Sequence, residues 1–178
     1  NTPYKEELVL PQLEELIKDY PIDAFFIDIP DVDPVDICYC QYCQSKFKKM
    51  YGRELKDASF RERLSFYQAS VARFLKEVRL LINKYEKNIK IATNGSGEID
   101  RARIFTEEND ILVWESQPKN NYLSHSYVSR YVRTLDSPCQ VMSVRFYQGW
   151  GDLTLKPAAQ MTTEFAAMIG NGSPAVSG

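Results

Sequence analysis

One stretch decides the fold: Asp23-Ala24-Phe25-Phe26-Ile27-Asp28-Ile29. Apolar residues follow one another through its centre, which is typical of a strand buried on both faces in a parallel sheet. In front of it, apolar residues recur at helical spacing over residues 4–19, where Pro11 either kinks the helix or marks its true start. A helix that leads into such a strand indicates an α/β fold with crossover helices.

Helices and strands continue to alternate after residue 30. The longest predicted helix begins near Ser59, where Ser59-x-x-Glu62 forms a capping box ahead of a long apolar face. The other predicted elements are a short helix closed by Gly52, strands at 89–93, 110–115 and 140–146, helices near 101–108 and 123–135, a helix opened by Pro157, and the start of a strand at 174–178.

This order of elements predicts an incomplete (β/α)8 barrel. A whole barrel typically has about 250 residues, so the 178 residues fit roughly strands 4 to 8 with the first strands missing. The whole range 1–178 is then the C-terminal part of a barrel catalytic domain. An open doubly wound sheet is the alternative, although Asn94-Gly95-Ser96-Gly97 lacks the Rossmann and Walker patterns. Open barrel edges would also favour self-association.

Composition excludes two classes of partner. The formal net charge of -2 argues against nucleic-acid binding. An apolar run of about 20 residues, as needed to span a membrane, does not occur in this sequence, nor does a basic-then-apolar signal peptide at its start. We therefore expect neither a nucleic-acid nor a membrane partner, and the compartment stays open.

The ends of the predicted strands carry the candidate chemistry. In a parallel barrel the active site lies at the carboxyl ends of the strands, and two of these ends carry the acids Asp28 and Glu115. Enzymes that hydrolyse glycosidic bonds typically use a pair of carboxyl groups. These groups lie about 5–5.5 Å apart in retaining enzymes and about 6.5–9.5 Å apart in inverting ones. We expect sugar contacts from neighbouring polar and aromatic residues, namely Asn94, Trp114, Arg145, Tyr147 and Trp150.

Each acid also has a structural interpretation. Asp28 lies close to Asp31, Asp33 and Asp36, so it also fits a loop acid or a helix N-cap. Glu115 follows Trp114, and an indole beside an acid reduces its hydration and suits a general acid. A salt bridge to a strand-end base such as Arg145 is the structural alternative for Glu115.

A family resemblance joins these residues. Asn1-Thr-Pro-Tyr4, residues 23–29, Cys38-Tyr-Cys-x-x-Cys43, Phe47 and Tyr51-Gly52 together resemble the hypothetical glycosyl hydrolase 6 family, which is related to α-L-fucosidase-type barrels. The resemblance covers about a third of the chain. It implies that Phe26-Ile27-Asp28 corresponds to the fucosidase nucleophile motif. It also implies that Trp114-Glu115-Ser116 corresponds to the later Trp-Glu element with the acid/base, and that Gly149-Trp150 is a sugar-stacking loop.

The cysteine cluster has a second resemblance. Cys38, Cys40 and Cys43 are similar to the cluster that belongs to a zinc site in family 42 β-galactosidases, where Asn-Glu ends the preceding strand. Ile29 follows Asp28 here, so that mechanism does not transfer. A structural zinc site needs four ligands, so both structural zinc and buried free thiols fit. Cys139 is expected at the opposite end of the barrel, so the fourth ligand is either His125 or, as the resemblance to the related enzymes implies, a residue from an earlier segment of the barrel.

The sequence therefore predicts a glycoside hydrolase, retaining and α-L-fucosidase-like, that acts on a glycoside or oligosaccharide and requires no cofactor for catalysis. Asp28 is the expected nucleophile and Glu115 the expected acid/base. Activity of the 178 residues alone is not expected, because half of the barrel rim would be absent. The alternative is a non-catalytic carbohydrate-binding or scaffold domain that has kept the barrel.

Overall fold

The computed structural model describes residues 1–30, 38–95, 108–116, 123–135, 138–147, 151 and 153–177. Two compact units divide the chain: Asn1–Phe25 with Pro30–Lys90, and Phe26–Ile29 with Ile91–Gly178. The predicted helix near 101–108 falls almost wholly outside the described residues.

A parallel sheet positions the candidate site. Its five strands lie in the order β1-β2-β3-β4-β5, and the pairs β2–β3, β3–β4 and β4–β5 are parallel. The strands are β1 (Ala24–Ile27), β2 (Lys90–Gly95), β3 (Ile111–Ser116), β4 (Cys139–Ser143) and β5 (Ala175–Ser177). Sequential parallel order is what a barrel requires, and it confirms the prediction of a partial (β/α) barrel.

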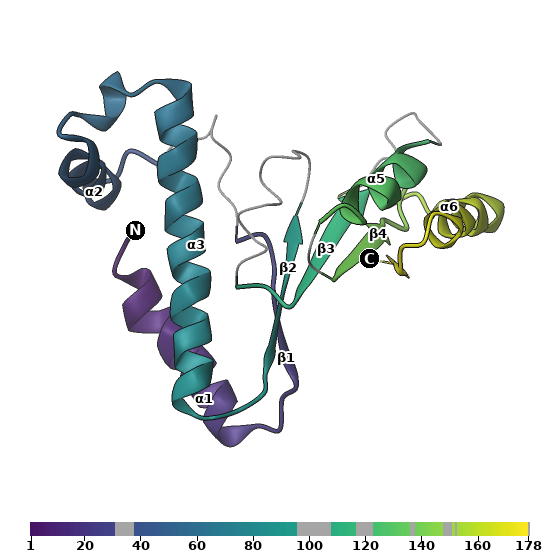
Figure 1. The fold of residues 1–178 in the computed structure, drawn as a ribbon, viewed down its shortest axis with the longest axis horizontal. Coiled ribbons are helices and arrows are strands. Elements are labelled where there is room, and N and C mark those ends of the chain that lie inside the picture. The colour runs from purple at the N-terminus through teal and green to yellow at the C-terminus, as the bar shows by residue number, and fades with distance from the viewer. Residues whose placement is uncertain are drawn as a thin grey trace. The chain divides into compact units, whose positions relative to one another are not determined.

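Two crossover helices cover one face of this sheet. Helix α5 (Ser124–Val132) packs on β3 and β4, and α6 (Ala158–Gly170) packs on β4 and β5 (Figure 1). Pro157 is the N-cap of α6, as the sequence predicts. The described segment β4 is shorter than predicted, because the chain leaves the sheet after Ser143 and forms an antiparallel bridge between Phe146 and Leu155 instead.

The first unit is built around the long helix α3 (Phe60–Lys84). Its capping box is present: the Ser59 side chain accepts from the Glu62 N–H, and the Glu62 side chain accepts from the Ser59 N–H. Helix α1 (Leu10–Asp19) packs along α3 (Figure 1). A π-helical turn, η1 (Lys5–Val9), precedes α1, so Pro11 stands in the first turn of the regular helix.

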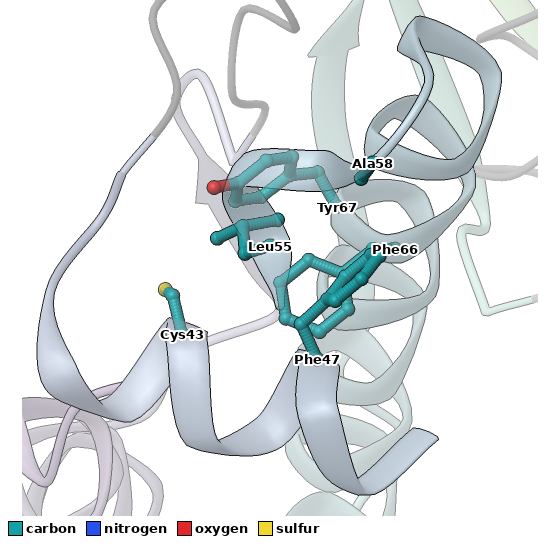
Figure 2. Close-up of a cluster of buried hydrophobic side chains, with 6 residues drawn as sticks. All are labelled: Cys43, Phe47, Leu55, Ala58, Phe66 and Tyr67. Carbon is teal, nitrogen blue, oxygen red and sulfur yellow. The ribbon is translucent and has the colours of Figure 1, made fainter. Parts of the chain in front are cut away.

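The same unit contains a compact cluster of buried, mostly apolar side chains. Helix α2 (Gln41–Tyr51) ends at Gly52, whose φ of 71° is the left-handed conformation that glycine adopts without a steric penalty. Next comes a short 3₁₀ turn, η2 (Leu55–Asp57). Figure 2 shows the buried side chains that these elements bring together with α3: Cys43, Phe47, Leu55, Ala58, Phe66 and Tyr67.

The prediction that β1 is buried on both faces is wrong. Phe25 is buried at 7% exposure, but Phe26 on the opposite face is 54% exposed. The physical reason is that Phe26 shares its face with Asp28, the face of the sheet that points away from the helices and into the barrel. A residue on the inner face of a barrel is covered by strands across the barrel, and the five described strands are only a section of one.

Candidate active site

Three strand ends bring one amide and two carboxyl groups together. Asn94 on β2 donates from Nδ2 to Asp28 Oδ1 at 2.6 Å and to Glu115 Oε1 at 2.9 Å. Asp28 follows β1, and Glu115 lies near the end of β3. All three residues belong to the second unit. The two acids that the sequence singles out are therefore neighbours, although 87 positions separate their numbers.

The sheet register explains why these side chains meet. Asn94 is paired with Val113, and side chains two positions apart on a strand share a face. Glu115 therefore projects from the same face as Asn94. Its neighbours Trp114 and Ser116 project from the other face, toward the helices. Alternation along β3 thus determines which residues reach the candidate site.

Burial differs between the amide and the acids. Asn94 is buried at 4% exposure, Glu115 is half-buried, and Asp28 is exposed. The amide forms the floor of the site, and the carboxyl groups stand above it at the carboxyl edge of the sheet. This arrangement leaves the acids accessible to a substrate while a buried group fixes their spacing.

The backbone after Asp28 has an unusual conformation and contacts the same amide. Ile29 has a φ of 43°, a left-handed conformation that is a genuine outlier for a β-branched residue. Its N–H donates to Asn94 Oδ1. The amide oxygen accepts while the amide nitrogen donates twice, so the orientation of the Asn94 side chain is determined. Strain of this kind is found mostly where surrounding structure enforces it, often at functional sites.

The distance between the two carboxyl groups bears on whether a glycosidase retains or inverts the anomeric configuration. Both carboxylate oxygens contact one nitrogen atom, at 2.6 and 2.9 Å. Even with the three atoms in line, these oxygens would be no farther apart than the ~5.5 Å typical of retaining glycosidases, and short of the ~6.5 Å at which inverting enzymes begin. The arrangement can provide a nucleophile on one side of a bond and a proton donor on the other.

Trp114 has a different environment from the one expected. Its indole is buried at 5% exposure and stacks edge-on against Tyr131 of α5, with ring centroids 5.6 Å apart. This packing favours a core role over a sugar contact. It also corrects the physical reason given for Glu115: the indole and the carboxyl group leave β3 on opposite faces, so Trp114 is not what desolvates the acid.

Two other predicted sugar-binding residues lie on a hairpin after β4. Arg145 is exposed, with its guanidinium 5.7 Å from the ring centroid of Phe146. Tyr147 is 54% exposed. Since β4 runs parallel to β3, both follow the same edge of the sheet that carries Glu115. Trp150 lies outside the described residues, as do Asp31, Asp33 and Asp36.

The three clustered cysteines meet in the first unit. The Sγ atoms of Cys38, Cys40 and Cys43 all lie within 4.8 Å of one another. Three thiolates on one zinc, each with a Zn–S bond of ~2.3 Å, would stand about 3.8 Å apart, so small movements would bring them to bonding positions. Soft thiolate donors select zinc and related metals. The described residues thus offer three of the four ligands that a structural zinc site needs.

Two of the thiols have shifted pKa values. Cys40 is the N-cap of α2, and the backbone amide of Cys43 in the first turn of that helix lowers the pKa of the Cys40 thiol. Burial raises the pKa of Cys43 to about 11.

The other residues considered as metal ligands lie in the second unit. His125 stands 3.6 Å from the Glu164 carboxylate, and Cys139 begins β4.

Solved structures of similar fold include an alpha-L-fucosidase and a hyaluronidase. The chain is similar to alpha-L-fucosidase isoenzyme 2 from Paenibacillus thiaminolyticus, with a TM-score of 0.75, 22% identity, and coverage of 99% of this chain and 26% of that one. It is also similar to bee venom hyaluronidase in complex with a hyaluronic acid tetramer, with a TM-score of 0.57, 13% identity, and coverage of 92% and 64%. A monoclinic crystal structure of the same hyaluronidase gives a TM-score of 0.59 at 11% identity, with coverage of 92% and 66%.

These similarities support the partial (β/α) barrel fold. The chain spans 26% of the length of the fucosidase. No family model matches the sequence, and no curated protein sequence matches it. Among the described helices, none has both the length and the apolar composition to cross a membrane.

Proposed function

We propose that this chain is part of a glycoside hydrolase that uses Asp28 and Glu115 as its two carboxyl groups. The observation that carries the proposal is the single buried amide of Asn94, which contacts both acids at the carboxyl edge of a parallel sheet. Glycosidic bond hydrolysis needs two carboxyl groups on either side of one bond. The similarity to fucosidase and hyaluronidase barrels supports the same reaction class.

The roles of the two acids follow from their surroundings. Asp28 is exposed at the edge of the sheet, so its carboxylate is the group that attacks the anomeric carbon. Glu115 is half-buried; it protonates the leaving oxygen and afterwards removes a proton from the attacking water. The short spacing supports the retaining course, in which the sugar is first bonded to Asp28. Arg145 and Tyr147 contact the sugar hydroxyls and ring face.

The substrate class is an α-L-fucoside or a closely related glycoside. The support is the Phe26-Ile27-Asp28 motif at the end of β1 together with the fucosidase similarity. The test is a panel of 4-nitrophenyl glycosides assayed with the complete protein, followed by NMR of the first sugar released. We expect turnover of the α-L-fucoside with retained anomeric configuration. Inverted configuration would contradict the nucleophile role of Asp28, and turnover of none of the panel would contradict the enzyme assignment.

A non-catalytic carbohydrate-binding domain is the alternative, and the exposed Tyr147 beside Arg145 is compatible with it. Binding of a fucoside without turnover, unaffected by Asp28→Asn, would favour this alternative over the hydrolase.

We also propose that Cys38, Cys40 and Cys43 supply three of the four ligands of a structural zinc ion. Their convergence within 4.8 Å supports this, and a metal would tie the start of α2 to the segment before it. Elemental analysis of the complete protein is expected to give one zinc per chain, lost in the double variant Cys38→Ser/Cys43→Ser and kept in the control Cys139→Ser. A metal-free protein, or a Cys40–Cys43 disulfide found by mass spectrometry, would contradict the zinc assignment.

A further inference from the structure

A buried charged cluster lies on the helix-covered side of β4. The Lys156 side chain is 1% exposed and the Glu164 side chain 3% exposed, and Lys156 Nζ donates to Glu164 Oε2 at 2.8 Å. Lys156 Nζ also donates to Ser143 Oγ at 3.1 Å, and Ser143 Oγ donates to Glu164. Ser143 is the last residue of β4, and Glu164 lies in α6.

The Glu164 carboxylate has hydrogen-bond partners on both of its oxygens. Gln160 Nε2 donates to Glu164 Oε1 at 2.9 Å, so both carboxylate oxygens have partners. Burial opposes ionisation of Glu164, yet the hydrogen bonds from Lys156, Ser143 and Gln160 outweigh it and hold its pKa below the ordinary value. His125 of α5 also faces this carboxylate, with Nε2 at 3.6 Å from Oε2. A buried ion pair is weak evidence for stability, but removing one partner leaves a buried charge uncompensated.

Lys156 also connects the cluster to the segment that follows β4. The rim hairpin, formed by residues 144–147 and 153–156, is joined by backbone hydrogen bonds from Lys156 N–H to Arg145 O at 2.9 Å and from Tyr147 N–H to Thr154 O at 2.9 Å. Phe146 and Leu155 form the bridge between its arms. One residue, Lys156, therefore contributes its backbone to the hairpin and its side chain to the buried cluster.

The rim hairpin has little buried surface of its own. Leu153 is 87% exposed, Leu155 is 64% exposed and Tyr147 is 54% exposed. Among its described residues, Val144 and Lys156 are the buried ones, and both stand at its base. The direction in which the hairpin projects thus depends on how that base is held. Lys156 holds it through Ser143 on the sheet and Glu164 on α6.

We propose that Lys156 and Glu164 are positioning residues for substrate binding: their buried contact fixes the rim hairpin and, through it, Arg145 and Tyr147. The inference rests on the proposed function, since it assigns these two residues to the sugar-binding rim. A side chain that orients a binding group alters affinity without touching the substrate. Loss of the anchor leaves Asp28 after β1 and Glu115 on β3 in place while the hairpin samples other directions.

Two variants and one matched control test this in the complete protein. Lys156→Met keeps the length of the side chain and removes its charge and hydrogen bonds. If it does not fold, Lys156→Met/Glu164→Leu replaces the pair with apolar side chains, a change that is often tolerated. Lys84→Met is the control, because Lys84 pairs with Glu14 at 2.8 Å but is 63% exposed. Hydrogen exchange is measured on peptides that contain Tyr147 and Lys156 and, for comparison, on those from β3.

We expect both variants at residue 156 to raise exchange of the hairpin peptides about 10-fold or more, with β3 peptides and the Lys84→Met control unchanged. On a 4-nitrophenyl glycoside that the protein hydrolyses, KM rises about 10-fold while kcat changes less than about 3-fold. Unchanged hairpin exchange, or an equal rise across the sheet, would overturn the positioning role. Exchange is measured without substrate, so it tests the anchoring of the hairpin even if no glycoside is hydrolysed and the proposed function fails.

Discussion

Asp28→Asn is expected to lower kcat for the hydrolysed glycoside by about 10³-fold or more. The variant keeps the shape of the side chain and an oxygen that can accept from Asn94, so the site remains assembled. An amide, however, is not a nucleophile toward the anomeric carbon. Initial rates on 4-nitrophenyl glycosides measure the effect, and the melting temperature is expected to stay within a few degrees of the parent.

Asp23→Asn is the matched control for this loss. Asp23 directly precedes β1 and is exposed, and its carbonyl oxygen accepts from the Lys90 N–H. It therefore stands at the opposite end of the same strand from Asp28. We expect the control to keep the activity of the parent. Equal activity in Asp28→Asn and Asp23→Asn would dismiss Asp28 as the nucleophile.

Asn94→Asp is the second large effect that we expect. The substitution preserves the size of the side chain but replaces the NH₂ group that donates to Asp28 and Glu115 with an acceptor. Three carboxyl groups would then share one small site, and like charges at such distances cannot all be ionised at neutral pH. We expect kcat/KM to fall about 10²-fold or more, and the pH optimum to shift because an added proton is shared among the acids.

Asn94→Ala separates the two causes of that loss. It removes the donor without adding a charge, so we expect a smaller fall in kcat/KM than in Asn94→Asp and a pH optimum close to that of the parent. Activity close to that of the parent in Asn94→Asp, together with a large loss in Asn94→Ala, would show that the amide acts by filling space alone, which would contradict its role in setting the distance between the acids.

Much of this architecture is predictable from local patterns. The capping box at Ser59 and the left-handed Gly52 depend on the nearest neighbours in sequence, and both are present in the structure. The convergence of Asp28 and Glu115 follows from a general property of parallel sheets, in which the carboxyl ends of the strands share one edge. Local signals and one topological rule were sufficient to predict these features.

Other features depend on side-chain direction and on distant partners. Trp114 and Glu115 are adjacent in sequence, yet one packs against Tyr131 and the other contacts Asn94. The period of two along a strand could have separated their roles, whereas a motif that takes the pair as a unit cannot. The bridging role of Asn94 and the strained Ile29 carry no recognisable sequence signal, because their partners come from another strand.

The buried pair of Lys156 and Glu164 illustrates the same limit. A lysine before a proline and a glutamate within a helix are both typical of solvated positions. Their burial becomes evident only when β4 and α6 are packed together. A charged pair of this kind therefore has to be found in the structure.

One measurement tests the assignment of Asp28 most directly: covalent trapping with a 2-deoxy-2-fluoro glycosyl fluoride of the hydrolysed sugar. In this reaction a carboxylate oxygen bonds to the anomeric carbon and fluoride leaves, and the electron-withdrawing 2-fluoro group slows hydrolysis of the resulting ester. Peptide mapping is expected to place the sugar on Asp28, next to the amide that also contacts Glu115. A sugar found on any other residue, or turnover with no trapped ester, would contradict the proposed site.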